Sequence, residues 1–407
     1  MIPSRRRGAC PGLSTPMPTG DGLLARLLPI GTIALDAFAG LAAAARAHGN
    51  GIVEITARGS IQIRGLTPAS APAFADAAAG LGIAANEGVP VIADPLAGLD
   101  PSEALDASVL AAELRRALAA QAFTAMLAPK VCVVIDGGGR LHLDALSADV
   151  RLCAEATERG ARIHVAVAGN AATATPIGVI EPTHAVETVV RLLGIIATHG
   201  RAARARDVDT WMPDRRAART IRDDNGNVIG IHQLRGNQVA LGIGFAFGHA
   251  EASALEALIQ AARDAGATGF RAAPGRALLM IGLAPDRVAP LIAAATTLGF
   301  IVDAGDLRRR VVACAGAPLC ASAEIPTRAL ASKLMAAAAL LDDGEVIHVS
   351  GCAKGCAHRG ATALTAIGRA GQCDLLWRGA PAGSVAVEAL PQSLAQLAQR
   401  PRRAAHG

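Results

Sequence analysis

The feature that most constrains the fold is an internal repeat with a period of 218 residues. The matching positions are Gly51 with Gly269, Arg58 with Arg276, Ile61 with Leu279, and Ile63 with Ile281. In the first copy the pattern predicts a helix over 35–48 and two strands within 52–66; in the second it predicts a helix over 255–264 and strand structure over 270–283. We expect two similar halves that form an internal pseudo-dimer with a cleft between them. Chance similarity of alanine-rich segments is the alternative.

Composition narrows the class of protein. A chain of 407 residues is long enough for two or three cores. The net charge of +5 and an aromatic content of 2% argue against nucleic-acid binding, because few rings are present to stack on bases. Arg5 to Arg7 precede a proline-rich stretch with no apolar core, so no signal peptide is expected, and no apolar window is long enough for a membrane span. We expect a cytoplasmic protein.

Several connecting segments also carry patterns. Residues 133–143 combine apolar alternation with the turn Asp136-Gly-Gly-Gly, which predicts a hairpin. A strand is expected over 163–167 and a helix over 185–199. The segment 201–226 contains seven arginines and is expected to be a solvated linker. In the last third, the patterns predict a helix over 329–341 and strands over 345–349 and 360–367.

Four cysteines carry the strongest chemical signal. Cys314-x5-Cys320 is followed by Cys352-x3-Cys356. In a chain without a secreted disulfide pattern, such clustering favours a metal centre. Four thiolates among alanines and glycines suit a four-iron four-sulfur cluster. Structural zinc is the nearest competitor, although x5 is loose spacing for it, and unliganded thiols remain a third interpretation.

Three segments resemble the sulfite and nitrite reductase superfamily. The second cysteine pair, within His348-Val-Ser-Gly-Cys-Ala-Lys-Gly-Cys-Ala, resembles the cluster signature of those enzymes. The segment 55–62, Ile-Thr-Ala-Arg-Gly-Ser-Ile-Gln, resembles their Thr-x-Arg-Gln-x-x-Gln strand. The segment 127–133, Leu-Ala-Pro-Lys-Val-Cys-Val, resembles their Leu-Pro-Arg-Lys-Phe-Lys-Val strand. The resemblance covers most of residues 20 to 390.

The resemblance implies an α/β (α+β) fold with two pseudo-symmetric halves, each a ferredoxin-like half domain plus an α/β reductase-type domain. It implies the following division of the chain: residues 1–72, an N-terminal segment with the first ferredoxin-like half domain; 73–200, the first α/β half; 201–230, a linker; 231–305, the second ferredoxin-like half domain; 306–392, the iron-sulfur cluster α/β half; and 393–407, a frayed tail.

Three departures distinguish this chain from the reductases. Gly59, Pro129 and Cys132 stand where those enzymes have Gln, Arg and a second Lys. The reductases use the lost cations to protonate a bound oxyanion, so six-electron reduction of sulfite or nitrite is disfavoured. The segment at 7–12, the segment at 17–24 and the variant around Lys354 instead resemble the oxygen-dependent branch of the superfamily. That branch hydroxylates the tetrapyrrole precorrin-3A at C20, with lactone formation, in aerobic cobalamin biosynthesis.

The resemblance to that branch implies a monooxygenase and assigns roles to particular residues. The expected catalytic residues are Arg58 and Lys130, the expected substrate-binding residues are Arg7, Arg58, Arg64 and Lys130, and the expected cluster ligands are Cys314, Cys320, Cys352 and Cys356. Arginine side chains could clamp the carboxylates of the tetrapyrrole in bidentate fashion. The cofactor is a four-iron four-sulfur cluster, and an additional iron or a sirohaem-like tetrapyrrole is left open.

The resemblance implies precorrin-3A and O2 as partners. An external electron-donor protein is also expected, because no dinucleotide-binding or Walker-type motif is present. A sirohaem-dependent sulfite or nitrite reductase is the first alternative function. A non-catalytic iron-sulfur electron carrier is the alternative of another class. Plainer interpretations of Arg58 as a surface charge and of Cys10 as an ordinary N-terminal thiol also stay open. For Arg276, which matches Arg58 but lies near Pro274, a structural relic of the repeat is the favoured interpretation.

Overall fold

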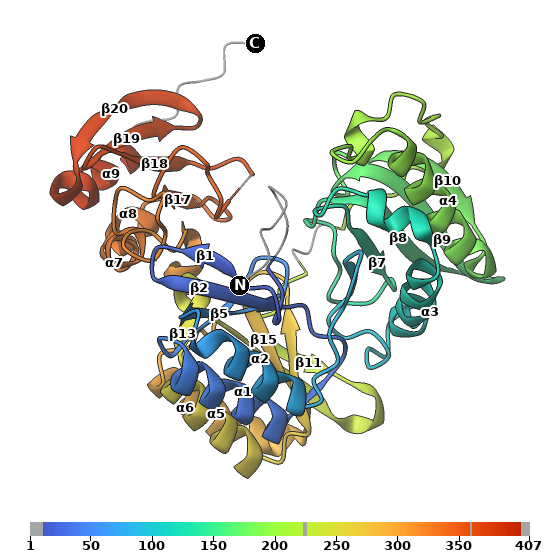
Figure 1. Ribbon diagram of the computed structural model, residues 1–407, viewed down its shortest axis with the longest axis horizontal. Helices are drawn as coiled ribbons and strands as arrows, with labels where there is room; N and C mark the ends of the chain where they lie inside the picture. The colour runs from blue at the N-terminus through green and yellow to red at the C-terminus, as the bar shows by residue number, and fades with distance from the viewer. Residues whose placement is uncertain (1–10, 223–225, 359, 400–407) are drawn as a thin grey trace.

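The computed structural model describes residues 11–222, 226–358 and 360–399. Within these residues the chain forms four five-stranded sheets. Figure 1 shows two of them in a central body and the other two in lobes on either side, one green and one orange to red. Arg7 and Cys10 lie outside the described residues. None of the described helices combines the length and the apolar character needed to cross a membrane.

The central body contains two sheets of matching design. The first has the order β1-β2-β5-β4-β13 and the second has the order β11-β12-β15-β14-β3. Elements of the first copy are β1 (Met17–Thr19), β2 (Gly22–Leu27), β3 (Ile33–Ala34), α1 (Leu35–His48), β4 (Ile52–Ile55), β5 (Ile61–Leu66) and α2 (Ser70–Gly80). Elements of the second copy are β11 (Gly230–Gln233), β12 (Val239–Gly244), β13 (His249–Glu251), α5 (Ala252–Asp264), β14 (Gly269–Ala273), β15 (Ala277–Leu283) and α6 (Val288–Thr297).

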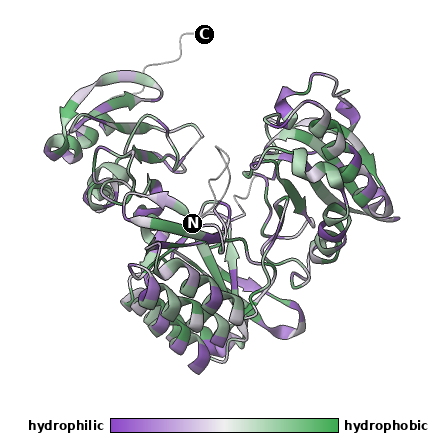
Figure 2. Cartoon of the chain, viewed as in Figure 1, coloured by the Kyte–Doolittle hydropathy of each residue, from purple (hydrophilic) through white to green (hydrophobic). Residues whose placement is uncertain are grey.

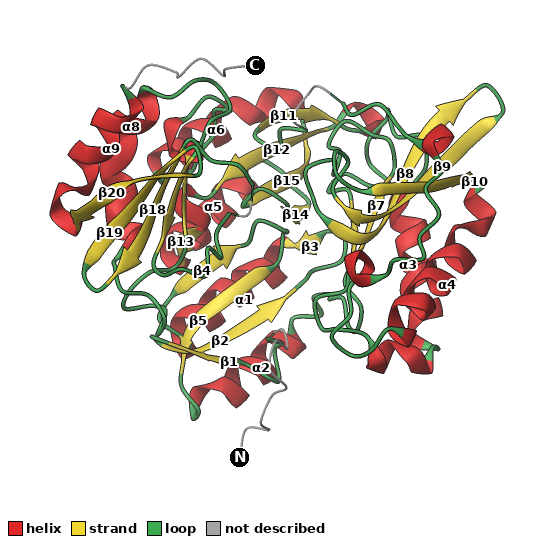
Figure 3. Ribbon diagram, turned by 90° about the horizontal axis from the view of Figure 1, so that it is seen from above, coloured by secondary structure: helices red, strands yellow, loops and turns green. Residues whose placement is uncertain are grey.

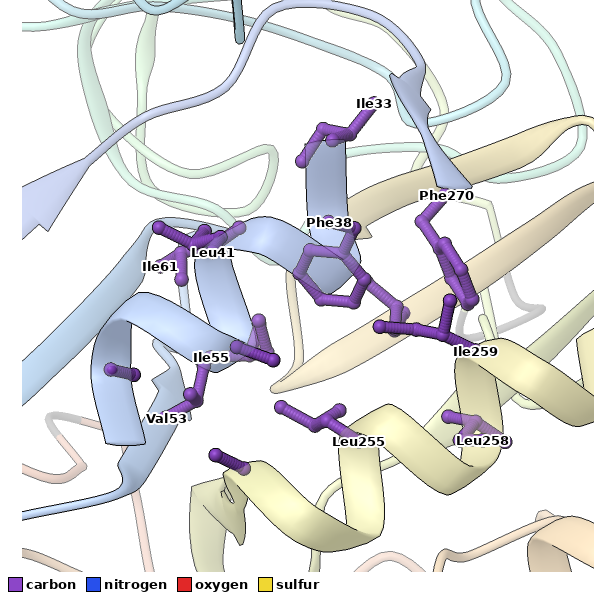
Figure 4. Packing of buried hydrophobic residues seen from close by; sticks show 14 of the residues in the cluster. Ile33, Phe38, Leu41, Val53, Ile55, Ile61, Leu255, Leu258, Ile259 and Phe270 are labelled. Atoms are coloured by element: carbon purple, nitrogen blue, oxygen red, sulfur yellow. The ribbon is translucent and has the colours of Figure 1, made fainter. Parts of the chain in front are cut away.

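The two copies exchange strands. The short strand β3 of the first copy pairs with β14 of the second, and β13 of the second copy pairs with β4 of the first. Each exchanged strand leads directly into a helix, so α1 and α5 are brought together across the pseudo-symmetry axis. Figure 4 shows Phe38 of α1 facing Phe270 and Ile259, and the rings of Phe38 and Phe270 lie 4.9 Å apart. The central body therefore has one shared hydrophobic core.

The two outer lobes also match each other. The sheet orders are β6-β7-β8-β9-β10 and β16-β17-β18-β19-β20. In both, the first three strands are parallel and the last two antiparallel. The first lobe consists of β6 (Val91–Ala93), α3 (Ala107–Ala119), β7 (Val133–Asp136), β8 (Ala148–Thr157), β9 (Gly160–Gly169), β10 (Thr175–Ile180) and α4 (Ala185–Thr198). The second consists of β16 (Val311–Ala313), α7 (Thr327–Ala331), α8 (Met335–Ala339), β17 (Ile347–Ser350), β18 (Leu364–Arg369), β19 (Gln372–Trp377), β20 (Ala380–Ala386) and α9 (Leu390–Ala398).

The repeat therefore extends over the whole architecture, as Figure 3 shows from above. Hydrophobic residues follow the sheets and the inner helix faces, whereas hydrophilic residues gather on outer faces and hairpin ends (Figure 2). The mixed α/β class with two pseudo-symmetric halves is confirmed.

Two local expectations are wrong. No hairpin forms over 133–143, because the strand after β7 is the parallel neighbour β8, and the turn after β7 is tied down by the Asp136 carboxylate. Leu141 and Leu143 are buried in separate apolar clusters instead of pairing as a strand. The helix expected over 329–341 is interrupted between α7 and α8 by a short 3-10 turn.

Within the segment expected as a solvated linker, residues 201–222 are not simply solvated. Arg204 pairs with Asp149 at 2.7 Å, and Arg219 donates to both oxygens of Asp144 at 2.6 Å. Arg222 pairs with Asp136 and lies 3.3 Å from Asp144. These carboxylates are buried in the first outer lobe, and the arginines neutralise them. The segment is thereby held against that lobe.

Asp144→Asn is expected to destabilise the protein by about 3 kcal/mol at pH 7, because it leaves buried cations without their anion. Burial alone would raise the pKa of Asp144, but hydrogen bonds from Arg219 and Arg222 lower it to about 2. The stabilisation is thus present above the ordinary value of 3.8 and is lost as pH falls through about 2. Urea unfolding across this pH range should show the difference between variant and wild type shrinking in acid.

The exposed pair between Asp36 and Arg263 supplies the control. Because Asp36 is 87% exposed in its side chain, Asp36→Asn should cost less than about 1 kcal/mol. Equal costs for the two substitutions would contradict a buried role for Asp144.

Candidate functional site

The four cysteines come from the carboxyl ends of two neighbouring strands. Cys314 directly follows β16, and Cys352 follows β17 by one residue. The two strands are parallel and hydrogen-bonded, so their carboxyl ends lie at the same edge of the sheet. Such an edge is where open α/β sheets usually bind ligands. The topology therefore explains how two pairs of cysteines that are distant in sequence reach one place.

All four thiols lie in one electrostatic environment. The pKa of the Cys356 thiol is raised by partial desolvation and then by its neighbours Cys352, Cys314 and Cys320. Cys356 is exposed, whereas the other three are half-buried. The Cys356 thiol is therefore close enough to the other three thiols to interact with them electrostatically.

Short contacts hold the two cysteine loops against each other. The backbone N–H of Gly351 donates to Cys314 Sγ at 3.2 Å, and Glu324 N donates to Gly351 O at 2.7 Å. Lys354 Nζ donates to Ser322 Oγ at 2.8 Å, which links the second loop to the first. An N–H group directed at a cysteine sulfur stabilises the thiolate form that iron or zinc requires.

The donor set fits an iron-sulfur cluster. Four cysteines are gathered without a carboxylate among them, and His348 beside them is buried with no hydrogen-bond partner for its Nε2 among the described residues. Burial, and then the nearby His358 and Arg276, lower the pKa of His348 to about 4. The described side chains contain no set of three or more His, Cys, Asp or Glu arranged to hold a single metal ion.

Gly351→Ala is expected to reduce the iron content of the purified protein. An added Cβ would lie 2.6 Å from the Ala323 Cβ and 3.4 Å from Cys314 Sγ, so the loops would have to separate. Gly178→Ala is the matched control, because a Cβ there meets nothing within 4 Å. Iron and acid-labile sulfide per chain measure the effect. Equal values for the two variants would contradict the close packing.

Arg58 bridges the central body and the first outer lobe. Its guanidinium donates to the Ser147 carbonyl at 2.9 Å and to Cys132 Sγ at 3.0 Å. It lies in the turn between β4 and β5, where Thr56 Oγ1 accepts from the backbone N–H groups of Arg58 and Ser60. The cysteine that replaces the lysine of the reductases is therefore a direct partner of Arg58.

The structure explains why a glycine stands at position 59. Its φ is +80°, and an added Cβ would lie 3.1 Å from the Ala273 backbone. The turn of the first copy thus packs closely against the corresponding turn of the second, where Gly275 N donates to Ala57 O at 3.1 Å. A glutamine side chain would be strained at this position.

Lys130 is exposed in the turn before β7, two residues ahead of Cys132. Lys130 is thus close in the sequence to Cys132, whose sulfur accepts a hydrogen bond from Arg58.

Arg64 does not lie as expected. The residue is 3% exposed, and its guanidinium pairs with Asp21 at 2.9 Å and Glu54 at 3.5 Å. It also donates to the carbonyl of Leu319, next to Cys320. With two carboxylates already bound, Arg64 connects the first sheet to the cysteine loop instead of offering a free carboxylate clamp. The cause is that Asp21 lies in the turn between β1 and β2, and β2 is the neighbour of β5, the strand that carries Arg64.

Two charged side chains at the contact between the central body and the second outer lobe were not among the predicted site residues. Glu54 on β4 is buried and pairs with Arg328, the second residue of α7, eight residues after Cys320. Arg276 donates to the Ala357 carbonyl at 2.8 Å, one residue after Cys356. Glu54 carries no local signal, because its partner Arg328 lies far away in the sequence. For Arg276 the repeat gave the signal, since it matches Arg58.

Comparisons with known proteins identify the family and agree with the fold. Residues 15–81 match the family model described as the nitrite/sulfite reductase ferredoxin-like half domain. A precorrin-3B synthase from Sinorhizobium sp. is 39% identical over 390 residues, covering 94% of this chain and 85% of the relative. The structure of the Mycobacterium tuberculosis NirA protein superposes with a TM-score of 0.74 at 18% identity, covering 94% of this chain and 82% of that one.

Proposed function

The chain belongs to the precorrin-3B synthase family, and from this membership we propose that it hydroxylates precorrin-3A at C20, using O2, with closure of a lactone. The observation that carries the proposal is 39% identity across 94% of the chain. The activity is that of an oxidoreductase, specifically a monooxygenase.

The proposed cofactor is a four-iron four-sulfur cluster held by Cys314, Cys320, Cys352 and Cys356. The gathered thiols, the Gly351 N–H directed at Cys314 and the unpartnered His348 nitrogen support it. Such a cluster supplies electrons one at a time. The hypothesis also allows an additional iron or a sirohaem-like tetrapyrrole. Among the described residues, no group of three or more His, Cys, Asp or Glu side chains is arranged to hold such an iron.

The chain's own cations would bind and orient the substrate. Precorrin-3A is a polycarboxylate, and Arg58 presents a planar fork suited to a carboxylate. The Ser147 and Cys132 contacts fix one edge of this guanidinium, and the remaining N–H donors would face the substrate. Lys130, which is exposed nearby, would supply a second cation or donate a proton. Arg7 is proposed as a further clamp on sequence grounds.

Hydroxylation consumes two electrons and two protons for each O2, so a reductant must be supplied. We propose an external electron-donor protein, because the chain has no dinucleotide-binding motif. The cytoplasm is the proposed compartment, since cysteine thiols stay reduced there.

The alternative of a sirohaem-dependent sulfite or nitrite reductase has less support. The likeness to NirA, at 18% identity, is a likeness of fold. Cys132 takes the place of a lysine that the reductases use, and it accepts a hydrogen bond from Arg58.

The test of the proposal compares substrates on one preparation. The purified protein, supplied with reductant and air, should convert precorrin-3A and leave sulfite and nitrite unreduced. Its visible spectrum should contain broad cluster absorption without the strong bands of sirohaem. Sirohaem bands together with sulfite reduction would overturn the proposal.

A further inference from the structure

Arg276 occupies the same place in the second half as Arg58 in the first. It ends the turn between β14 and β15, as Arg58 lies in the turn between β4 and β5, and the two turns touch through the bridge between Arg58 and Pro274. Arg276 has φ +63°, a left-handed conformation that is costly for a residue with a side chain. The surrounding structure maintains this conformation for a long cationic side chain.

Both arginines contact equivalent loops. Arg58 donates to the carbonyl of Ser147, in the loop between β7 and β8. Arg276 donates to the carbonyl of Ala357, in the loop between β17 and β18, at 2.8 Å. Because β7 and β17 hold the same position in their sheets, the contact is conserved between the halves. The loops differ in content: the second carries Cys352 and Cys356.

The path of the Arg276 side chain is tightly fitted. An added Cβ on Gly248 would lie 2.8 Å from the Arg276 Cδ, so the aliphatic stem passes directly over this glycine. The backbone is anchored as well, because Phe245 N donates to Arg276 O at 3.0 Å. The guanidinium is therefore placed at the cysteine loop by both its stem and its backbone.

The charge of Arg276 is not neutralised locally. Among the described residues no carboxylate lies within ion-pair distance of it, and its printed hydrogen bond goes to a neutral carbonyl. Burial lowers the pKa of Arg276, with the more distant Glu54 acting in the opposite direction. Lys354, which lies on the cysteine loop itself, is exposed and donates to Ser322. The guanidinium instead contacts the backbone of the loop that carries Cys352 and Cys356.

We propose that Arg276 is a positioning residue for the cluster, holding the loop of Cys352 and Cys356 and raising the reduction potential of the cluster by its positive charge. The proposal rests on the proposed four-iron four-sulfur cofactor. Reduction adds one negative charge to the cluster, and a partly buried cation beside it favours the more negative state. A relic of the repeat would have no such effect.

The experiment compares midpoint potentials in the full-length protein. Arg276→Gln removes the charge, Arg276→Lys retains it, and Arg271→Gln is the matched control. Arg271 lies on the same hairpin, and it also donates to main-chain carbonyls, at Pro95 and Ala97, away from the cysteines. An EPR-monitored redox titration of each variant measures the potential, and iron and sulfide analysis measures the cluster content.

Arg276→Gln should shift the midpoint potential to lower values, while Arg276→Lys and Arg271→Gln should stay near wild type. An unshifted potential in Arg276→Gln with full cluster content would overturn the proposal. If Arg276→Gln loses its cluster, Arg276→Lys decides: a potential near wild type supports the charge effect, and a lowered one overturns it. A wild-type protein without iron and sulfide would instead refute the cofactor, and an iron-loaded protein inert towards precorrin-3A would refute only the proposed reaction.

Discussion

Cys352→Ser is expected to abolish cluster binding and to lower the turnover of precorrin-3A by at least about 100-fold. A serine hydroxyl stays protonated where a cysteine gives a thiolate, so one of the four ligands is lost. Cys352 lies just after the end of β17, and Cys314 lies just after the neighbouring strand β16. The Cys356 thiol interacts electrostatically with the other three thiols. Iron and acid-labile sulfide per chain, together with the EPR signal of the reduced protein, measure the loss.

Cys373→Ala is the matched control for this variant. Cys373 is buried in β19 of the same lobe. Burial, and then the nearby carboxylates of Asp374 and Glu388, raise its pKa to about 11. It is therefore a protonated core residue, and its replacement should leave the iron content unchanged. Cluster content retained in Cys352→Ser, or lost equally in Cys373→Ala, would contradict the assignment of ligands.

Arg58→Ala is expected to lower kcat/KM for precorrin-3A by about 100-fold, which corresponds to about 2.7 kcal/mol. A charge-assisted contact to a carboxylate contributes a loss of this size. Arg58→Lys should recover part of the activity, because it keeps the charge but not the planar fork. Steady-state kinetics on cluster-loaded protein measures both variants.

A structural role of Arg58 must be separated from a role in binding. Its contacts with Ser147 and Cys132 join the central body to the first lobe, so the thermal midpoint of each variant should be measured as well. Arg271→Ala is the comparison, since Arg271 makes a similar contact with Ala97. Turnover by Arg58→Ala equal to wild type would show that Arg58 does not bind a carboxylate of the substrate. If Arg271→Ala shows the same kinetic loss, the effect of Arg58→Ala comes from weaker contact between the central body and the first outer lobe, and not from lost substrate binding.

The sequence predicted the features that depend on local pattern or on exact spacing. The helix at 35–48 ends where Gly49 and Asn50 interrupt the apolar pattern, and α1 has those bounds. The 218-residue period predicted the paired halves, because a duplicated sequence repeats its own turns and strands. The cysteine spacing predicted one shared site, and the parallel neighbours β16 and β17 bring Cys314 and Cys352 to the same edge of the sheet.

Features that depend on contacts between distant segments escaped prediction. The exchanged strand β3 has two residues, too few for a detectable alternation, and its partner lies more than two hundred residues away. Arg64 was expected in a cleft, but Asp21 and Glu54 bind it, and no local pattern reports such pairing. The arginines of 201–222 looked solvated for the same reason, because their carboxylates belong to another segment.

The most direct test of the central claim is a single-turnover experiment with oxygen. The cluster-loaded protein is incubated anaerobically with precorrin-3A and a reductant, and isotopically labelled O2 is then admitted. We predict a lactone-bearing product that is heavier than precorrin-3A by one oxygen atom derived from O2, formed only after the gas is added. A product formed without O2, or no lactone-bearing product after O2 is added, would contradict the account.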